Sequence, residues 1–306
     1  MPTPEEAKER ATFTFNAAAD TFDDSALDWD HFGGKTVAQL SLGTGARVLD
    51  VCCGSGASAI PAAEVIGPSG LVVGIDLADK LLELARAKAE RRFLKNVFLR
   101  NADLLALQYP VESFDAVICV FGIFFVPDMS SAGKELWRFV RPGGKLAITT
   151  WGPELLEPAN GAFWQAVQGV RPELDRAFHP WDHINNPEDL RHMLGEAGVG
   201  PDEVITENRW QPLRSADDWW AIVMGTGYRG TVERLSLAER NAVKEANLAF
   251  IREHGIVKVS TNALYAVATK RRDKKVIVSG IGVASLISTA RKDLELCHTT
   301  YHAVSC

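Results

Sequence analysis

Between residues 46 and 151 the chain alternates short apolar runs with longer segments whose apolar positions recur at helical spacing. In one such segment Leu81, Leu84 and Ala85 follow the i, i+3, i+4 pattern of an amphipathic helix. The predicted strands are 46–52, 70–77, 96–103, 114–121 and 145–151, the predicted helices are 58–67, 80–92 and 130–140, and 141–144 is a predicted turn. Nearly continuous apolar strands that alternate with helices predict a parallel sheet covered on both faces.

After Trp151 this alternation stops. Residues 152–186 are rich in Pro, Trp and Asn and contain no clear strand. The predicted elements beyond them are a capped helix at 186–199, a strand at 202–210, two helices within 215–254 around the glycine-rich link 225–230, and a last strand at 257–270. A charged break at 270–275 precedes a final segment that resembles nothing upstream, and its stretch 276–287 is apolar enough that we expect it to pack against another surface.

Composition narrows the class of protein. The 306 residues are 46% hydrophobic and 24% charged, which is ordinary for a soluble globular protein and excludes a disordered or collagen-like chain. The net charge of −6 lacks the basic excess that nucleic acids or anionic membranes attract. The longest apolar run, 116–126, is too short to span a bilayer, and the acidic N-terminus has no signal-peptide core. Five cysteines without a CxxC pair predict a cytoplasmic protein with free thiols and no zinc site.

The segment 48–58, VLDVCCGSGAS, carries the clearest chemical signal. An apolar strand leads to Asp50, then to a turn built on Gly54 and Gly56, and then to a helix whose free N–H groups favour an anionic group. Asp76 follows 20 residues after Gly56, at the end of the next strand, where a carboxylate can accept hydrogen bonds from a ribose.

Two classes of cofactor fit this pattern. The stretch 54–59, GSGASA, also satisfies the GxGxxG/A fingerprint of dinucleotide-binding proteins, so an NAD-dependent oxidoreductase stays an alternative. Asp50 favours a cationic or zwitterionic ligand over a pyrophosphate, and Asp103 ends the third strand, where it can hold an adenine amino group. A non-catalytic cofactor-binding module is a second alternative.

With these motifs, followed by FDAV at 114–117 and RPGG at 141–144, the chain resembles the class I S-adenosylmethionine-dependent methyltransferases, especially the group of ubiquinone and menaquinone C-methyltransferases. The resemblance covers about 40–150 well and 186–270 loosely. The cofactor-binding residues that it implies are Asp50, Cys52, Gly54, Ser55, Gly56, Asp76, Leu77, Ala102, Asp103, Leu104, Cys119 and Val120.

The chain departs from the family pattern at two places. Cys52 replaces the first loop glycine, a variant also found among the quinone methyltransferases, and Phe124 and Phe125 stand where many relatives have two histidines. The motif that acts on flipped nucleobases is missing from 119–127, which argues against a DNA methyltransferase. We therefore expect a pocket lined by Phe121, Phe124, Phe125 and Trp151.

The resemblance implies a Rossmann-like α/β fold with a seven-stranded, mostly parallel sheet whose last strand is antiparallel. We expect an N-terminal helical cap at 1–40, a cofactor-binding core at 41–151, a substrate-binding insertion or lid at 152–255, a final core strand at 256–270 and an extension at 271–306. The implied reaction transfers a methyl group to an O, N, S or C nucleophile of a small aromatic or heterocyclic metabolite, yields S-adenosylhomocysteine and needs no metal. A homo-oligomer is compatible with the sequence.

With phenylalanine at 124 and 125, a general base must come from the insertion, the N-terminal segment or the substrate. His179 and His183 are the candidate bases because histidine titrates near neutral pH, although loop histidines are often structural. Tyr228 and Arg229 are candidates for orienting the acceptor.

Overall fold

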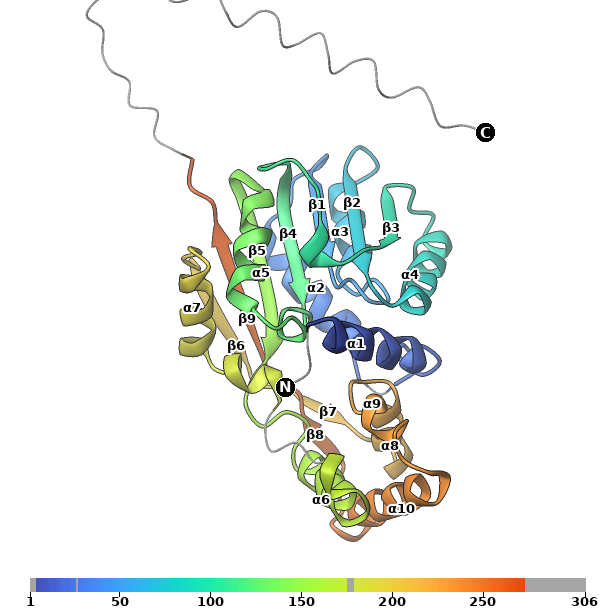
Figure 1. Cartoon of the computed structure of the whole chain (residues 1–306). Helices are drawn as coiled ribbons and strands as arrows, with labels where there is room; N and C mark the ends of the chain where they lie inside the picture. Colours follow the sequence, from blue (N-terminus) through green and yellow to red (C-terminus); the bar gives the residue numbers. More distant parts are fainter. Residues whose placement is uncertain (1–3, 26, 175–178, 273–306) are drawn as a thin grey trace, which may run out of the picture. The chain divides into compact units, whose positions relative to one another are not determined.

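The computed structural model describes residues 4–25, 27–174 and 179–272 (Figure 1). The extension expected at 271–306, with its apolar stretch 276–287, lies outside the described residues except for Arg271 and Arg272. Among the described residues, no helix combines the length and the apolar character that a membrane crossing requires.

A seven-stranded sheet forms the centre of the fold. Its order is β3 (Val97–Asn101), β2 (Leu71–Asp76), β1 (Arg47–Val51), β4 (Phe114–Val120), β5 (Val140–Trp151), β9 (Ala263–Thr269) and β6 (Glu203–Glu207). The pairs among β1 to β5 are parallel, whereas β9 runs antiparallel to both β5 and β6. The predicted sheet is therefore confirmed. The strand order reverses between β1 and β4, where ligands bind in open α/β sheets.

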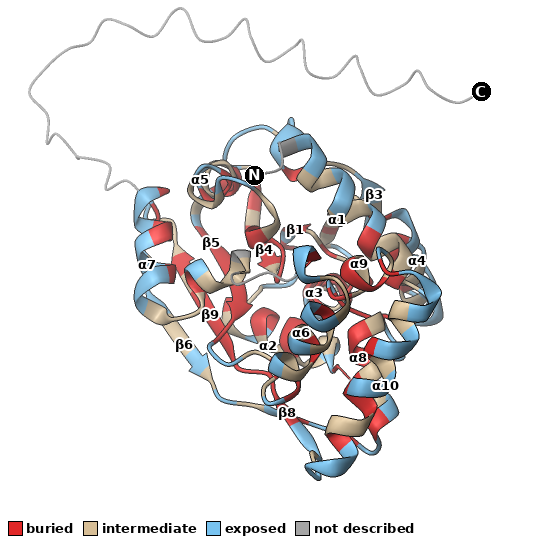
Figure 2. Ribbon diagram, turned by 60° about the horizontal axis from the view of Figure 1, so that its bottom comes forward, coloured by how far each residue is buried: buried red, intermediate tan, exposed pale blue. Residues whose placement is uncertain are grey.

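Helices cover both faces of the sheet because successive strand residues point to opposite sides. On β4, Ala116 and Ile118 belong to an apolar cluster with α2 (Trp29–Leu40) and α3 (Ala59–Ile66). Val117 and Cys119, which alternate with them, belong to a second cluster with α5 (Met129–Phe139) and α7 (Pro187–Glu196). The helix α4 (Asp79–Arg91) packs against β2 and β3 (Figure 1). Buried residues accordingly concentrate on the strands and on the inner sides of the helices (Figure 2).

A second group of helices lies beyond the carboxyl ends of the strands (Figure 1). Its members are α1 (Pro4–Ala18), α6 (Ala159–Val170), α8 (Ala216–Met224), α9 (Arg229–Val232) and α10 (Leu237–Glu253). The helix α10 packs against α6 and α8, and α1 packs against α9 and α4. Short 3₁₀ turns occur at η1 (Leu104–Ala106), η2 (Ile123–Phe125), η3 (Pro172–Leu174) and η4 (Pro180–Ile184).

The structure corrects several predicted elements. The strand expected at 257–270 is broken into β8 (Lys258–Ser260) and β9, because Thr261 and Asn262 turn to bind the backbone of Arg209. The strand expected at 202–210 ends at Glu207, and β8 pairs instead with the short strand β7 (Trp210–Pro212). The segment 215–254 forms three helices rather than two, since α9 follows the glycine-rich link.

The turn expected at 141–144 lies within β5, where it forms a bulge opposite β4. Gly143 adopts a φ of 84°, in the left-handed region that glycine tolerates. Its N–H donates to the carbonyl oxygen of Lys270 (2.6 Å), and the Lys270 N–H donates to the carbonyl oxygen of Gly144 (2.9 Å). Hydrogen bonds to Lys270, which is far along the chain, therefore hold the segment that was expected to be a turn within the sheet.

Candidate active site

A cavity lies at the carboxyl ends of β1, β2, β3 and β4. The loops that follow these strands form one wall, and residues of α1, of the segment after it and of 226–228 form the other. Among the twelve residues predicted to bind cofactor, nine line this cavity: Cys52, Gly54, Ser55, Asp76, Leu77, Ala102, Asp103, Leu104 and Val120. The other three, Asp50, Gly56 and Cys119, are not among the described lining residues.

Asp76 ties the first loop to the second strand. Its carboxylate accepts hydrogen bonds from the N–H of Gly54 (2.9 Å) and of Ala78 (2.8 Å). Burial raises the pKa of Asp76, and these backbone hydrogen bonds offset only part of the increase. The carboxylate therefore lies in the cavity wall with two of its acceptor positions in use.

Asp50 is completely buried behind this loop. The Ser58 hydroxyl donates to its Oδ2 at 2.7 Å, and its Oδ1 has no hydrogen-bond partner within the described part of the chain. Burial raises the pKa of Asp50 from 3.8 to about 7, against the hydrogen bond from Ser58. Asp50 is thus poised between its neutral and ionised forms near neutral pH.

Cys52 takes the place of a glycine at a position that has a φ of 54°. A Cβ placed on Gly122 would lie 2.4 Å from the Cβ of Cys52, so the two loops can approach only because residue 122 is glycine. A hydrogen bond with the Cys119 thiol and burial both raise the pKa of Cys52. Cys52 is therefore a neutral thiol, and both side chains extend the apolar surface at the end of β4.

Asp103 follows β3 and caps η1, accepting a hydrogen bond from the N–H of Leu105 at 2.9 Å. Lys8 of α1 lies 3.5 Å from the same carboxylate, so α1 closes over this end of the cavity. Ser55 is held in a similar way: its hydroxyl donates to Asp23 at 2.6 Å, and Lys88 contacts both residues.

Aromatic side chains form the wall beside the end of β4. Phe121 stacks on Trp151 with ring centroids 3.7 Å apart, and Trp29 packs against both rings. Phe22 stacks on Trp29 at 4.8 Å. All four residues line the cavity. Phe121 and Trp151 were predicted for this pocket, whereas Phe22 and Trp29 were missed.

The other two predicted pocket residues, Phe124 and Phe125, also lie in the lining, on η2. Phe125 packs edge-on against Phe15 of α1, and Phe124 packs against Trp181 of η4. The aromatic wall therefore continues from the sheet onto α1 and onto the segment after β5.

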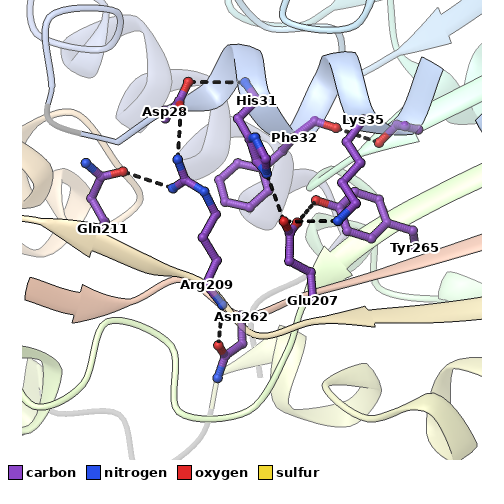
Figure 3. Close-up of polar contacts among 10 residues, drawn as sticks. Asp28, His31, Phe32, Lys35, Glu207, Arg209, Gln211, Asn262 and Tyr265 are labelled. Atoms are coloured by element: carbon purple, nitrogen blue, oxygen red, sulfur yellow. Dashed lines mark hydrogen bonds and ion pairs between the residues drawn. The ribbon is translucent and has the colours of Figure 1, made fainter. Parts of the chain in front are cut away.

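A polar network anchors the helix that supplies Trp29 (Figure 3). Arg209 pairs with Asp28 at 2.9 Å, directly before α2. Glu207 accepts hydrogen bonds from His31 (3.0 Å), Lys35 (3.0 Å) and Tyr265 (2.6 Å).

Partial burial acts to raise the pKa of Glu207, but the hydrogen bonds from Tyr265, Lys35 and His31 outweigh it, so the pKa lies below 4.5. An ionised Glu207 thus fixes α2 against the edge of the sheet (Figure 3).

One of the four predicted catalytic residues is among the described residues that line the cavity. Tyr228 lines the cavity, and its hydroxyl donates to Asn160 at 2.7 Å. Burial, followed by the charges of Glu157 and Asp182, raises the pKa of Tyr228, so its phenol stays protonated. The other three predicted residues, His179, His183 and Arg229, are not among the described lining residues.

His179 and Arg229 make contacts with neighbouring side chains. His179 is the N-cap residue of η4: its backbone N–H donates to Asp182 Oδ2 at 2.8 Å, and its ring stacks on Trp181 at 4.6 Å. Arg229 pairs with Glu233 (2.5 Å) and lies 3.4 Å from Asp20, which joins α9 to the segment after α1. His183 lies within η4.

The fold and this cavity define the class of protein. The strand order, the glycine loop after β1 and the acid at the end of β2 are the features expected of a class I S-adenosylmethionine-dependent methyltransferase. The sequence pattern of the ubiE/COQ5 methyltransferase family matches residues 26–180, and the chain belongs to that family. It is an S-adenosylmethionine-dependent methyltransferase, as the sequence predicted, rather than an NAD-dependent oxidoreductase.

Relatives of known name agree with this assignment. The demethylmenaquinone methyltransferase of Lactococcus lactis is 31% identical over 176 residues, 56% of this chain and 70% of that protein. Aklanonic acid methyltransferase DauC of Streptomyces sp. strain C5 is 35% identical over 204 residues, 62% of this chain and 92% of that protein. The demethylmenaquinone methyltransferase of Geobacillus sp. is 37% identical over 40% of this chain, a match that spans about half of that protein (52%).

Solved structures share the fold at lower identity. A phosphoethanolamine N-methyltransferase of Haemonchus contortus superposes with a TM-score of 0.55 at 17% identity, covering 89% of this chain and 61% of that one. The [4+2]-cyclase SpnF superposes with a TM-score of 0.55 at 18% identity, covering 88% of this chain and 97% of that one. A cyclase thus shares the architecture, and the reaction must be argued from the family and the site rather than from the fold.

Proposed function

We propose that this protein methylates a hydroxylated or quinol-type aromatic molecule, either at a carbon of the ring or at the oxygen of a hydroxyl group on the ring. The observation that carries the acceptor class is the aromatic wall beside β4, where Phe121, Trp151 and Trp29 meet. Flat aromatic rings pack well against such a wall, and its large apolar surface favours a ligand that loses water on binding. The name of one relative, a demethylmenaquinone methyltransferase, points the same way, since it names a quinone.

The cofactor would occupy the part of the cavity between the ends of β1 and β3. Asp76 would accept the ribose hydroxyls and Asp103 would lie beside the adenine, while Gly54 and Ser55 form the floor. The lining fits this role because a Cβ on Gly54 would meet only side-chain atoms at 3.8 Å or more, which leaves the backbone accessible from the cavity. When bound, S-adenosylmethionine supplies an electrophilic methyl group on a positively charged sulfur.

The protein's own contribution would be positioning and the exclusion of water. Tyr228 and Cys52 are protonated weak acids, and no histidine is among the described lining residues. The acceptor would therefore bring its own ionised oxygen or carbanion to the site. A phenolic hydroxyl ordinarily has a pKa of about 10, so the reactive form would be the minor ionised fraction near neutral pH.

We also propose that the segments 1–40 and 152–255 act as lid and substrate pocket. Lys8 and Phe15 of α1, Trp181 of η4 and Tyr228 before α9 all line the cavity opposite the sheet. None of these residues belongs to the sheet or to the helices that cover it, which favours a wall that closes over bound ligands.

Transfer of labelled methyl from S-adenosylmethionine to 1,4-dihydroxynaphthalene, kept reduced under nitrogen, tests the proposal. We expect Trp151→Ala to lower the transfer rate about 10- to 100-fold because the ring is no longer held in place. Binding of S-adenosylhomocysteine should persist in this variant. The matched control is Trp210→Ala, since Trp210 is 50% exposed and lies outside the described lining. Equal loss in both variants, or no transfer by the wild type to any hydroxylated ring, would contradict the proposal.

A further inference from the structure

The glycine-rich link 225–230, GTGYRG, lies between α8 and α9 and presses against the N-terminal segment. A Cβ on Gly225 would lie 2.9 Å from the Cβ of Ser25, and one on Gly230 would lie 2.3 Å from the hydroxyl of Thr14. Real side chains do not tolerate such distances, so glycine is required at both ends of the link. The two close contacts fix the residues between them against the cavity.

The residues between these glycines, Thr226, Gly227 and Tyr228, all line the cavity. Thr226 is only 7% exposed, and its hydroxyl has no hydrogen-bond partner among the described residues. Within the described part of the chain, seven buried side chains have a polar atom without a hydrogen-bond partner. Of these seven residues, Thr226 is the one that lines the cavity. A buried hydroxyl without a partner destabilises the protein, so its presence in a ligand site points to a partner on the ligand.

Tyr228 does not compete for that partner. Its hydroxyl donates to Asn160 Oδ1 at 2.7 Å, and Asn160 Nδ2 donates in turn to Glu157 Oε1 at 3.0 Å. Tyr228 therefore contributes its ring to the wall, while the Thr226 hydroxyl stays without a partner among the described residues. A Cβ on Gly227 would meet nothing within 4 Å, so close packing does not require glycine at this position.

We propose that Thr226 is a substrate-binding residue whose hydroxyl forms a hydrogen bond with a hydroxyl or carbonyl oxygen attached to the ring of the acceptor. A threonine hydroxyl can donate to a carbonyl or accept from a phenol, so either form of oxygen satisfies it. The proposal rests on the aromatic acceptor proposed above and names the group on that acceptor that the protein recognises.

Two ligands with the same ring system and three variants test this proposal. The ligands are 1,4-dihydroxynaphthalene, kept reduced under nitrogen, and naphthalene, which has the same rings without oxygen. Binding to the protein saturated with S-adenosylhomocysteine is followed by calorimetry. Thr226→Val removes the hydroxyl at nearly constant volume, Thr226→Ser keeps it, and Thr231→Val is the matched control because Thr231 is 8% exposed and outside the described lining.

We expect Thr226→Val to weaken binding of the dihydroxy compound about 3- to 10-fold and to leave naphthalene binding unchanged. Thr226→Ser and Thr231→Val should bind both compounds like the wild type. Unchanged binding of the dihydroxy compound by Thr226→Val, or an equal loss for both compounds, would overturn the role of Thr226 while leaving the aromatic acceptor intact. If the wild type bound neither compound, the proposed function would fail together with this inference.

Discussion

Asp50 offers the sharpest test of the electrostatics of this site. The change is Asp50→Asn, which keeps an oxygen that can accept the hydrogen bond from Ser58 but removes the ionisation. Burial raises the pKa of Asp50 from 3.8 to about 7, so the folded protein favours the neutral carboxyl. An unfolded chain has no such preference. The free energy of unfolding of the wild type must therefore fall as the pH rises between these two values.

The size of the effect follows from the same shift. Below pH 3.8 Asp50 is protonated in both the folded and the unfolded state, so it does not change the free energy of unfolding. Between pH 3.8 and about 7 the free energy of unfolding falls by about 1.4 kcal/mol per pH unit. Above about pH 7 the loss stays constant. The full difference is about 4 kcal/mol. Relative to the wild type, the Asp50→Asn variant should become steadily more stable from pH 4 to pH 7.

Urea denaturation of both proteins at pH 5, 6, 7 and 8, followed by tryptophan fluorescence, measures this difference. A difference in the free energy of unfolding that is the same at every pH would report only how asparagine packs. The change of this difference with pH is therefore the quantity that tests the raised pKa of Asp50. Asp24→Asn is the control because Asp24 is exposed. If the curves of the wild type and Asp50→Asn stayed parallel across this range, Asp50 would not have a raised pKa and the reasoning would be refuted.

Three further predictions concern binding and catalysis. Asp76→Asn should weaken binding of S-adenosylhomocysteine about 10- to 100-fold in calorimetry, as expected for hydrogen bonds to a charged group, and wild-type affinity would argue against its ribose role. EDTA should leave the transfer rate unchanged, because no described group of three or more His, Cys, Asp or Glu side chains can hold a metal ion; loss of activity restored by magnesium or zinc would contradict this. His179→Ala and His183→Ala should keep the wild-type pH–rate profile, and His179→Ala should lower the melting temperature because the ring of His179 stacks on Trp181. A rate about 10²- to 10⁴-fold slower in either variant would instead identify a general base.

The central sheet was predictable because parallel strands covered on both faces are apolar along their whole length. The strands β1, β2, β3 and β4 were expected within two residues of their observed ends. The break between β8 and β9 was not, because no local pattern marks Asn262 as a residue whose side chain binds Arg209 and Pro153. The contacts that decide this break lie 53 and 109 residues away in sequence.

The two walls of the site also differ in how far the sequence predicts them. The glycine loop and Asp76 are joined by the 2.9 Å hydrogen bond to Gly54, and a fixed sequence spacing encodes such a contact. The opposite wall takes Phe15, Phe22 and Trp29 from the N-terminal segment, and no spacing relates them to β4. Their only sequence signal is the density of aromatic residues between 13 and 32, which the helical pattern alone does not connect to a ligand.

The placement of polar groups around the cavity explains how a methyltransferase can work without a histidine at the end of β4. The carboxylates of Asp76 and Asp103 accept hydrogen bonds from backbone N–H groups, and the phenol of Tyr228 is buried and donates to Asn160. The two carboxylates lie at the end of the cavity proposed for the cofactor and the phenol is already paired, so the wall that would face the acceptor consists of rings and the hydroxyl of Thr226. Such a wall can fix a ring plane and exclude water but cannot remove a proton, which leaves the acidity of the acceptor to decide which molecules react. Among acceptors of similar shape, we therefore infer that the more acidic ring reacts faster at neutral pH.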